Sequence, residues 1–284
     1  MLIQAQQLQE ELSNINLCIF DCRFAMPGPD FDPNYGREQY HQNHIPGAQY
    51  VDLEQDLSRE VTPQTGRHPF PNDNIFLDKL QKWGLSPEKK VVVYDDKGGV
   101  IAARLWWMLR YWVDHKDVHL LDGGFTSWQQ AKMPITSEAP AVQTSSHRYT
   151  TTQQYLRSTT EVRANIEEKK DIVVDARARP RFMGEQENVD PIAGHIPQAL
   201  NLPCMENLDA FGKFLKPEQL KSRFSHLLET VGEQGKIIHS CGSGVTACHN
   251  IFAMDLAEIH ASLLYAGSWS EWIQNPDNPI AVGE

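Results

Sequence analysis

Short apolar runs alternate with longer amphipathic stretches along this chain, and the alternation is regular. The runs VVVY at 91–94 and KIIHS at 236–240 are rich in β-branched residues, and a helical pattern of apolar residues follows each of them. Alternation of strand and helix is typical of parallel sheets whose two faces are covered by helices. We therefore expect an α/β fold built on parallel sheets.

Segments of the first half recur in the same order in the second half. The matching pairs are 19–53 with 173–202, 91–112 with 237–256, and 120–135 with 263–280. In the first pair, an apolar strand ends in Asp-x-Arg and is followed by a loop, His-Ile-Pro and a second short strand. The separation of matched residues falls from 154, for Asp21 and Asp175, to 144, for Trp128 and Trp272. Surface loops change length at little cost, so the repeat predicts two tandem copies of one fold.

A polar stretch without apolar periodicity separates the two copies. Residues 136–154 are rich in Ser and Thr, which is typical of a linker. We expect an N-terminal domain at 1–140, a linker at 141–154 and a C-terminal domain at 155–284. Two domains also agree with the length of 284 residues, since domains commonly contain about 100–200 residues.

Composition and charge narrow the class of partner. Hydrophobic residues make up 40% of the chain and charged residues 22%, which is ordinary for a globular protein. The 37 acidic residues outnumber the 26 Lys and Arg residues, and the net charge is −11. Nucleic acid and anionic lipid repel such a chain, so we expect neither as a partner. The sequence also shows no signal-peptide pattern and no apolar run of about 18 residues.

The five cysteines indicate a reducing compartment. Their number is odd and no Cys-x-x-Cys pair occurs, so neither a disulfide framework nor a zinc ribbon is predicted. We expect a cytoplasmic protein with free thiols and no metal site, in which one thiol can be reactive.

The strongest candidate for chemistry is Cys241. It follows the predicted strand that ends at 240, and a helical pattern begins at Ala247. Gly242 and Gly244 permit unusual backbone angles, so successive N–H groups can converge on the sulfur. The start of the following helix also favours negative charge, and both effects stabilise a thiolate or a bound anion. The alternative is a structural cysteine buried on a tight glycine turn.

The first copy carries no thiol at the equivalent place. When VVVYD, which ends at Asp95, is aligned with KIIHSC, which ends at Cys241, a carboxylate stands opposite the thiol. Two copies with one nucleophile predict a catalytic C-terminal domain and a catalytically inactive N-terminal domain.

Two classes of enzyme hold an anion in a loop that begins with cysteine. Cysteine-dependent phosphatases need Cys-x5-Arg, in which the arginine clamps the phosphate. Here Ala247 stands at the arginine position, and no Arg follows Cys241 in the chain. The remaining class carries sulfur as a persulfide, Cys–S–S⁻, whose outer charge suits converging N–H groups. That chemistry needs no metal and no organic cofactor.

Three sets of motifs carry a family resemblance: the loop CGSGVTA at 241–247, the paired Asp-x-Arg and His-Ile-Pro motifs, and GSWSEW at 267–272. Together they resemble the two-domain rhodanese family. The loop is similar to that of its 3-mercaptopyruvate sulfurtransferase branch and unlike the Cys-Arg-Lys-Gly-Val-Thr loop of thiosulfate-preferring members. The resemblance covers nearly the whole chain. It implies two tandem rhodanese-like domains, each a parallel sheet flanked by helices on both faces, with the substrate cleft between them.

The resemblance also implies a reaction. The Cys241 thiolate attacks the sulfur of 3-mercaptopyruvate, which leaves a Cys241 persulfide and pyruvate, and a thiol or cyanide then accepts the outer sulfur. The implied partners are a small-molecule sulfur donor and a thiol acceptor, for which a thioredoxin-like protein is a candidate. Within the family the alternative is a thiosulfate:cyanide sulfurtransferase. Outside it, the alternative is a non-catalytic sulfur carrier that hands sulfur to a partner protein.

Individual residues receive roles from the same resemblance. After the nucleophile, the active-site loop comprises Gly242, Ser243, Gly244, Val245 and Thr246. Ser243 matches a serine that relays protons, and its partners are expected from the first domain. His68, before a proline-rich turn, and Glu54, further upstream, are the candidates.

The carboxylate of the substrate needs a fixed cation, preferably an arginine that binds both of its oxygens. The family's arginine in the Arg-Phe pair after Asp-Ala-Arg is Arg181 here, whereas Arg177 is expected to pair with Asp175. The mercaptopyruvate branch has a second arginine shortly before Gly-His-Ile-Pro, but the segment 187–193 contains none. Arg67 is a candidate substitute.

Overall fold

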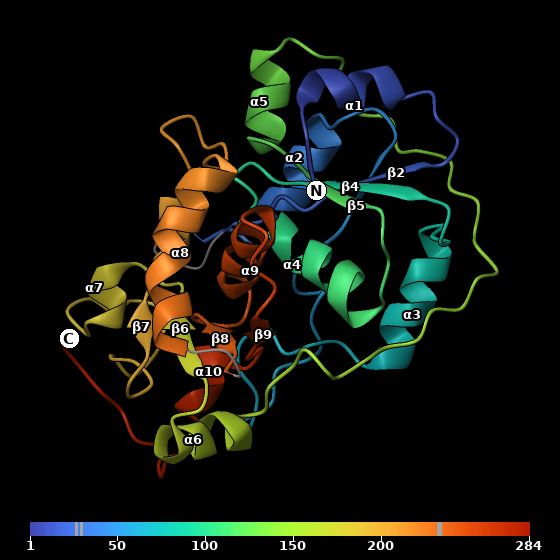
Figure 1. Ribbon diagram of the computed structural model, residues 1–284. Helices are drawn as coiled ribbons and strands as arrows, with labels where there is room; N and C mark the ends of the chain where they lie inside the picture. The colour runs from blue at the N-terminus through green and yellow to red at the C-terminus, as the bar shows by residue number, and fades with distance from the viewer. Residues whose placement is uncertain (26–27, 29–30, 232–234) are drawn as a thin grey trace. The chain divides into compact units, whose positions relative to one another are not determined.

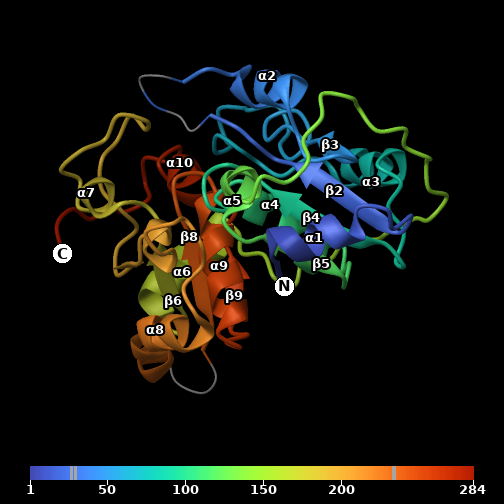
Figure 2. The same cartoon turned by 90° about the horizontal axis from the view of Figure 1, so that it is seen from above.

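The computed structural model describes residues 1–25, 28, 31–231 and 235–284. The described chain forms two compact units (Figures 1 and 2). Unit 1 comprises Met1–Arg59, Phe70–Gln153 and Ala210–Lys213, and unit 2 comprises Glu60–Pro69, Gln154–Asp209 and Phe214–Glu284. Each unit has its own sheet and its own core, as the repeat in the sequence predicts.

Within its described residues, unit 1 contains a parallel sheet with the strand order β1-β5-β4-β2-β3. The strands are β1 (Leu2–Ile3), β2 (Leu17–Asp21), β3 (Ala48–Tyr50), β4 (Lys90–Tyr94) and β5 (Val118–Leu121). The helices are α1 (Ala5–Glu11), α2 (Tyr35–Gln42), α3 (Asp73–Lys82), α4 (Ala102–Trp107) with its π-helical continuation η1 (Met108–Trp112), and α5 (Gly124–Gln130). The paired strands run parallel, so crossover connections join them.

Helices cover both faces of the sheet in unit 1. On one face, Leu8 of α1 and Trp128 of α5 join Tyr94 of β4 in one core cluster. On the opposite face, α4 packs against β4 and β5. There the ring of Trp83, at the end of α3, lies 5.2 Å from that of Phe20 on β2. Successive residues of a strand face opposite sides of the sheet, and here both sides are apolar.

Within its described residues, unit 2 repeats this plan with the strand order β7-β6-β8-β9. The strands are β6 (Ile172–Asp175), β7 (Leu200–Asn201), β8 (Ile237–Ser240) and β9 (Ser262–Leu264). The helices are α6 (Thr159–Glu168), α7 (Arg179–Phe182), the 3-10 turn η2 (Cys204–Asn207), α8 (Pro217–Val231), α9 (Thr246–Leu256) and α10 (Ser268–Trp272). The paired strands are again parallel.

Helices also cover both faces of the sheet in unit 2. Val162 of α6 and Trp269 and Trp272 of α10 join Val173 and Ile238 of the sheet in one cluster. The helices α8 and α9 pack against the opposite face. Figure 1 shows the sheet of unit 2 between these two helical layers. The structure thus confirms the predicted fold, two parallel sheets flanked by helices.

Strand registers align the two copies residue by residue. Asp21 of β2 lies opposite Tyr94 of β4, and Asp175 of β6 lies opposite Ser240 of β8. Tyr94 and Ser240 are therefore equivalent. The residues that follow them, a carboxylate in unit 1 and the candidate nucleophile in unit 2, occupy equivalent positions at the carboxyl ends of their strands.

The units differ from the predicted domains in two segments. The sequence pattern assigns residues 60–69 to the N-terminal domain, whereas the structure places them in unit 2, and residues 210–213 belong to unit 1. The backbone N–H of Arg67 donates to Ser270 Oγ (3.0 Å). Polar contacts of this kind hold residues 60–69 in unit 2. Such contacts cannot be predicted from the pattern of hydrophobic residues. The predicted linker 141–154 contains no helix or strand.

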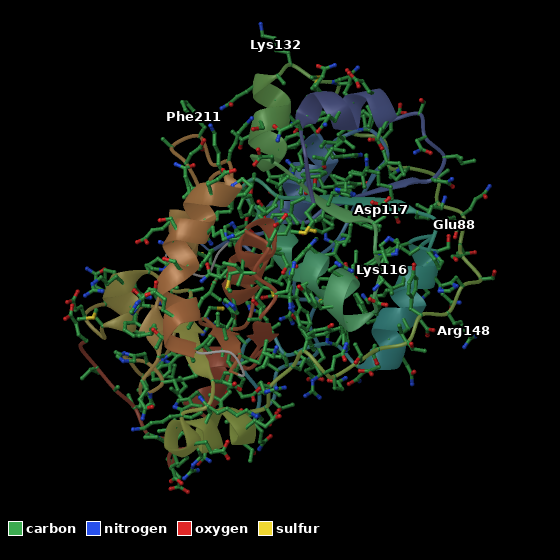
Figure 3. The ribbon with its side chains drawn as sticks, in the orientation of Figure 1. Glu88, Lys116, Asp117, Lys132, Arg148 and Phe211 are labelled. Atoms are coloured by element: carbon green, nitrogen blue, oxygen red, sulfur yellow. The ribbon has the colours of Figure 1, made fainter. Side chains whose placement is uncertain are left out.

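Some charged side chains lie at the surface. Lys116, Asp117 and Lys132 are exposed, and Lys132 projects outward at the top of Figure 3. In the part of the chain that the structure describes, no helix is long and apolar enough to cross a membrane.

Candidate active site

Cys241 lies directly after β8, where the chain turns from the sheet toward α9. Every residue of β8 is buried, and Cys241 itself is 1% exposed. The carboxyl ends of parallel strands are the usual position of ligand sites in such sheets. The loop that follows therefore begins at a site of the kind expected from the sequence.

Hydrogen bonds fix the loop, and one of its backbone donors reaches the sulfur. Gly244 donates its N–H to Cys241 Sγ (3.1 Å). The carbonyls of Cys241 and Gly242 accept N–H groups from Trp269 (3.0 Å) and Ser270 (2.8 Å) in the first turn of α10. Gly244 has φ +75°, and a Cβ there would lie 2.2 Å from Ala266 O. The position therefore requires glycine.

The rest of the loop is held in the protein interior. Val245 is buried and precedes the first residue of α9, Thr246. The hydroxyl of Thr246 hydrogen-bonds to Cys204, and burial raises the pKa of the Cys204 thiol to about 12. Cys248 donates its S–H to Gly244 O (3.3 Å), which is a packing contact within the helix start.

Ser268 is a residue at the site that sequence analysis missed. Its Oγ accepts the N–H of Cys241 (3.0 Å) and lies 4.0 Å from Cys241 Sγ. It has φ +54°, in the left-handed region that favours glycine, and the equivalent Gly124 of unit 1 has φ +57°. Serine pays this conformational cost while supplying a hydroxyl that glycine lacks. The sequence does offer one sign of this role: the second copy has Ser268, in GSW, where the first copy has Gly124, in GGF.

The structure joins Ser243 and His68. His68 Nδ1 lies 2.8 Å from Ser243 Oγ, and both side chains are buried. His68 packs in unit 2, although it lies within the first copy of the sequence repeat. Glu54, the other predicted partner, belongs to unit 1, where its N–H donates to Asp52 Oδ1 (2.9 Å). Its role in the relay stays a prediction.

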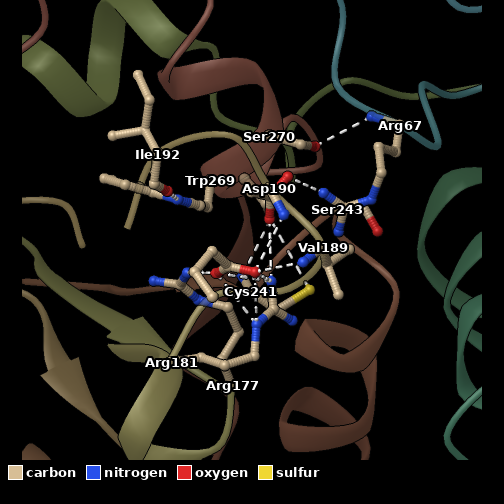
Figure 4. Close-up of polar contacts among 12 residues, drawn as sticks. Arg67, Arg177, Arg181, Val189, Asp190, Ile192, Cys241, Ser243, Trp269 and Ser270 are labelled. Atoms are coloured by element: carbon tan, nitrogen blue, oxygen red, sulfur yellow. Dashed lines mark hydrogen bonds and ion pairs between the residues drawn. The ribbon is translucent and has the colours of Figure 1, made fainter. Parts of the chain in front are cut away.

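Arg181, on α7, is bound by two carboxylates. Its Nε and Nη2 donate to both oxygens of Glu187 (2.8–3.1 Å), and Nη2 also donates to Asp190 Oδ2 (3.0 Å). Arg177 instead forms a buried bidentate pair with Asp175 (2.7–3.1 Å), which confirms its predicted structural role. Figure 4 shows these guanidinium groups gathered beside Cys241.

Arg67 brings another guanidinium to the loop. Its Nη1 donates to Asp190 Oδ1. A Cβ placed on Gly242 would lie 2.8 Å from Arg67 Nη2 and 3.7 Å from Arg181 Nη1. Both arginines therefore stand against the residue after the nucleophile, and the absent side chain at Gly242 makes room for them.

Burial and ion pairing compete in this cluster. Burial raises the pKa of Asp190, and the guanidinium groups of Arg67 and Arg181 offset this only in part. Burial also lowers the pKa of Arg67, which Asp190 counteracts. Burial acts to raise the pKa of Glu187 too, but N–H donation from Asp190 and hydrogen bonding by Arg181 outweigh it and leave that pKa below its usual value.

The equivalent loop of unit 1 holds an anion of its own. The buried carboxylate of Asp95 accepts four backbone N–H groups at 2.7–2.9 Å, from Lys97, Gly99, Ile101 and Ala102. The loop at the position equivalent to that of Cys241 thus forms an anion cradle in unit 1, and Asp95 fills it. Among the described residues no cluster of His, Cys, Asp and Glu could hold a metal ion.

Comparison with known proteins gives the family. The chain matches the family model of the rhodanese-like domain over residues 4–131 and 158–275. A Pseudomonas aeruginosa protein named probable 3-mercaptopyruvate sulfurtransferase is 45% identical over 100% of this chain and 98% of its own length. The thiosulfate sulfurtransferase of Rattus norvegicus is 32% identical over 95% of this chain and 90% of its own.

A solved structure agrees with these relatives. SseA from Escherichia coli, described as a 3-mercaptopyruvate sulfotransferase, superposes with a TM-score of 0.82 at 31% identity. The match covers 95% of this chain and 99% of SseA. Because both halves match the same domain and the relatives match over nearly their full length, this chain belongs to the rhodanese family of sulfurtransferases.

Proposed function

We propose that this chain moves a sulfur atom from 3-mercaptopyruvate to a thiol or cyanide through a persulfide on Cys241. The observation that carries the proposal is the N–H cradle. Gly244 N–H reaches the sulfur at 3.1 Å, and the equivalent cradle of unit 1 binds a carboxylate with four N–H groups. A persulfide places its outer negative charge where such donors converge.

In the first step, the Cys241 thiolate attacks the thiol sulfur of the donor. The new S–S bond forms as the donor's C–S bond breaks, and that electron pair leaves with carbon as the enolate of pyruvate. The S–H proton moves to the enolate carbon. The products are a Cys241 persulfide anion and pyruvate, and no metal or organic cofactor takes part.

The proton transfer in this step is assigned to Ser243 and His68. The 2.8 Å contact of Ser243 Oγ with His68 Nδ1 lets the hydroxyl accept a proton on one side while it gives one up on the other. Such a hydrogen-bonded pair can pass the S–H proton from sulfur to carbon. Both groups are buried, so bulk water does not compete for the proton.

In the second step, an acceptor removes the outer sulfur. Cyanide attacks it and leaves as thiocyanate, which restores the Cys241 thiolate. A thiolate acceptor attacks the same atom and leaves as its own persulfide. The physiological acceptor is proposed to be a thiol of a thioredoxin-like protein in the cytoplasm.

The donor's carboxylate is assigned to the guanidinium groups beside Gly242. Arg181 and Arg67 both stand within 4 Å of the place where a Cβ of Gly242 would be. A charge-assisted hydrogen bond contributes about 1.5–3 kcal/mol, which is roughly ten- to a hundredfold in affinity. Thiosulfate, a dianion, is the second candidate donor.

Steady-state kinetics with both donors and cyanide tests this proposal. We expect repeated turnover and a higher kcat/KM for 3-mercaptopyruvate than for thiosulfate. A preference for thiosulfate would overturn the donor and leave the persulfide in place. If the protein takes up one sulfur atom and shows no further turnover, the proposed catalysis is wrong and a sulfur carrier is favoured.

A further inference from the structure

We infer that Asp190 determines which sulfur donor the site accepts. Its single carboxylate holds two guanidinium groups beside the nucleophile loop and cancels one of their charges. The site thereby favours a planar monoanion, a 2-oxo carboxylate, over a dianion such as thiosulfate. This inference rests on the proposed sulfur transfer through Cys241.

The carboxylate of Asp190 is shared by two arginines. Oδ1 accepts from Arg67 Nη1, and Oδ2 accepts from Arg181 Nη2 at 3.0 Å. The side chain of Asp190 is 2% exposed, whereas those of Arg67 and Arg181 are 27% and 24% exposed. The acid therefore lies beneath the two guanidinium groups, which keep accessible surface of their own.

The backbone of Arg67 is fixed independently of Asp190. Its N–H donates to Ser270 Oγ, and a Cβ on Gly66 would lie 2.7 Å from the same Oγ. The next residue, His68, is bonded to Ser243 in the loop. Asp190 thus decides the direction of the Arg67 guanidinium and not the position of its main chain.

Charges in the cluster balance. Three arginines, Arg67, Arg177 and Arg181, face three carboxylates, Asp175, Glu187 and Asp190. Because the cluster is neutral overall, it does not offset the electrostatic repulsion between the Cys241 thiolate and an anionic donor. A dianion suffers about twice the repulsion of a monoanion, because the interaction energy scales with charge.

Replacing Asp190 with Asn leaves one surplus positive charge and removes the carboxylate that Arg67 and Arg181 share, while Arg181 keeps its pair with Glu187. A dianion gains about twice as much from that charge as a monoanion does. A planar carboxylate also loses the fixed pair of guanidinium groups that would bind its two oxygens. The two donors are therefore expected to respond in opposite directions, which a general loss of structure cannot produce.

The experiment measures KM and kcat for 3-mercaptopyruvate and thiosulfate in wild type and Asp190→Asn. We expect the ratio of kcat/KM for thiosulfate to that for 3-mercaptopyruvate to rise by about 10- to 100-fold, with KM for 3-mercaptopyruvate increased. Glu185→Gln is the matched control, since it removes an exposed acid from the same segment. Its ratio should equal that of wild type.

The conservative variant Asp190→Glu keeps the carboxylate and the net charge of the cluster. It should recover the wild-type ratio that Asp190→Asn loses. An unchanged ratio in Asp190→Asn, or equal losses with both donors, would overturn the role of Asp190. Wild-type protein that gains no sulfur from either donor, measured by intact mass, would instead overturn the proposed function.

Discussion

At the scale of single residues, the site depends on a few polar atoms held at fixed places. Gly244 offers its N–H to the sulfur of Cys241, and Ser243 is bonded to His68. These contacts join residues that are 3 and 175 positions apart in the chain. The local contact follows from the glycine-rich loop, whereas the distant one requires the fold.

The Ser243–His68 pair predicts a donor-dependent defect. Ser243→Ala should slow turnover with 3-mercaptopyruvate by about 10²–10⁴-fold and affect thiosulfate less. Mercaptopyruvate brings a proton that must reach the enolate, whereas thiosulfate leaves as sulfite. Steady-state kinetics with both donors measures the difference.

A double variant tests whether the two residues act together. His68→Ala should resemble Ser243→Ala, and the double variant should lose little more than either single one. Equal losses with both donors, or additive losses in the double variant, would contradict a shared relay.

How far the site could be predicted differs from residue to residue. The loop 241–247 identified the nucleophile because its glycines, its strand and its helix are all local features. Asp190 carried no such signal, and Ser268 carried only the contrast between GSW and GGF, because their roles arise from contacts with Arg67 and Cys241 that only the folded chain brings together. Arg181 was predicted from its motif, but its pairing with two carboxylates was not.

At the scale of secondary-structure elements, α10 and β8 hold the loop from its two sides. β8 delivers Cys241, and the first turn of α10 binds the carbonyls of Cys241 and Gly242. The sequence pattern indicated the strand β8, whereas the motif at 267–272 was noted without a helix being predicted there. The pattern did not indicate that a short helix would anchor the loop, since that contact depends on backbone groups present at every residue.

We expect a substitution of Ser268, at the start of α10, to affect sulfur loading much more than the free energy of unfolding. Ser268→Gly relieves a backbone cost of about 1–2 kcal/mol at φ +54° and loses the hydrogen bonds of the hydroxyl with Cys241 N–H and Tyr265 O, each of about 1 kcal/mol. The free energy of unfolding should therefore change little, while the rate of sulfur loading falls at least about tenfold. Urea unfolding and loading kinetics on the same protein measure both, and unchanged loading would show that the hydroxyl serves only the fold.

His239 in β8 predicts loss of stability in acid. Burial lowers its pKa to about 3, so the folded state stays neutral while the unfolded chain takes up a proton below about 6.5. The free energy of unfolding should therefore fall as pH decreases from 6.5 toward 3, by up to about 1.4 kcal/mol per pH unit from this group.

His239→Gln keeps a partner for Ser262, which lies 3.2 Å from His239 Nε2, and removes the titration. We expect urea unfolding at a series of pH values to show that the free energy of unfolding depends less steeply on pH in this variant, by the uptake of one proton. Identical slopes in variant and wild type would contradict the assignment.

At the scale of the whole molecule, two copies of one fold carry different groups directly after equivalent strands, a carboxylate at Asp95 and a thiol at Cys241. Strand order, register and the Asp-x-Arg pair recur in both units, and the repeated motifs allowed this to be predicted. The placement of residues 60–69 in unit 2 could not be predicted, because it depends on polar contacts of Arg67 and His68.

Asp95 predicts that the cradle of unit 1 serves stability and not catalysis. Asp95→Ala leaves four buried N–H groups without their acceptor, so the free energy of unfolding should fall by about 3 kcal/mol. The folded variant should still load one sulfur atom. Asp78→Ala, at an exposed position on α3, is the matched control for unfolding. Loss of loading in folded Asp95→Ala would contradict an inactive unit 1.

The most direct test of the account is the mass of the intact chain after incubation with a sulfur donor. Wild type should gain about 32 Da, one sulfur atom, and cyanide or a reductant should remove it. Cys248→Ser should gain the same mass, whereas Cys241→Ser should gain none and show no turnover. An adduct on Cys248, or sulfur transfer that persists in Cys241→Ser, would contradict a persulfide on Cys241.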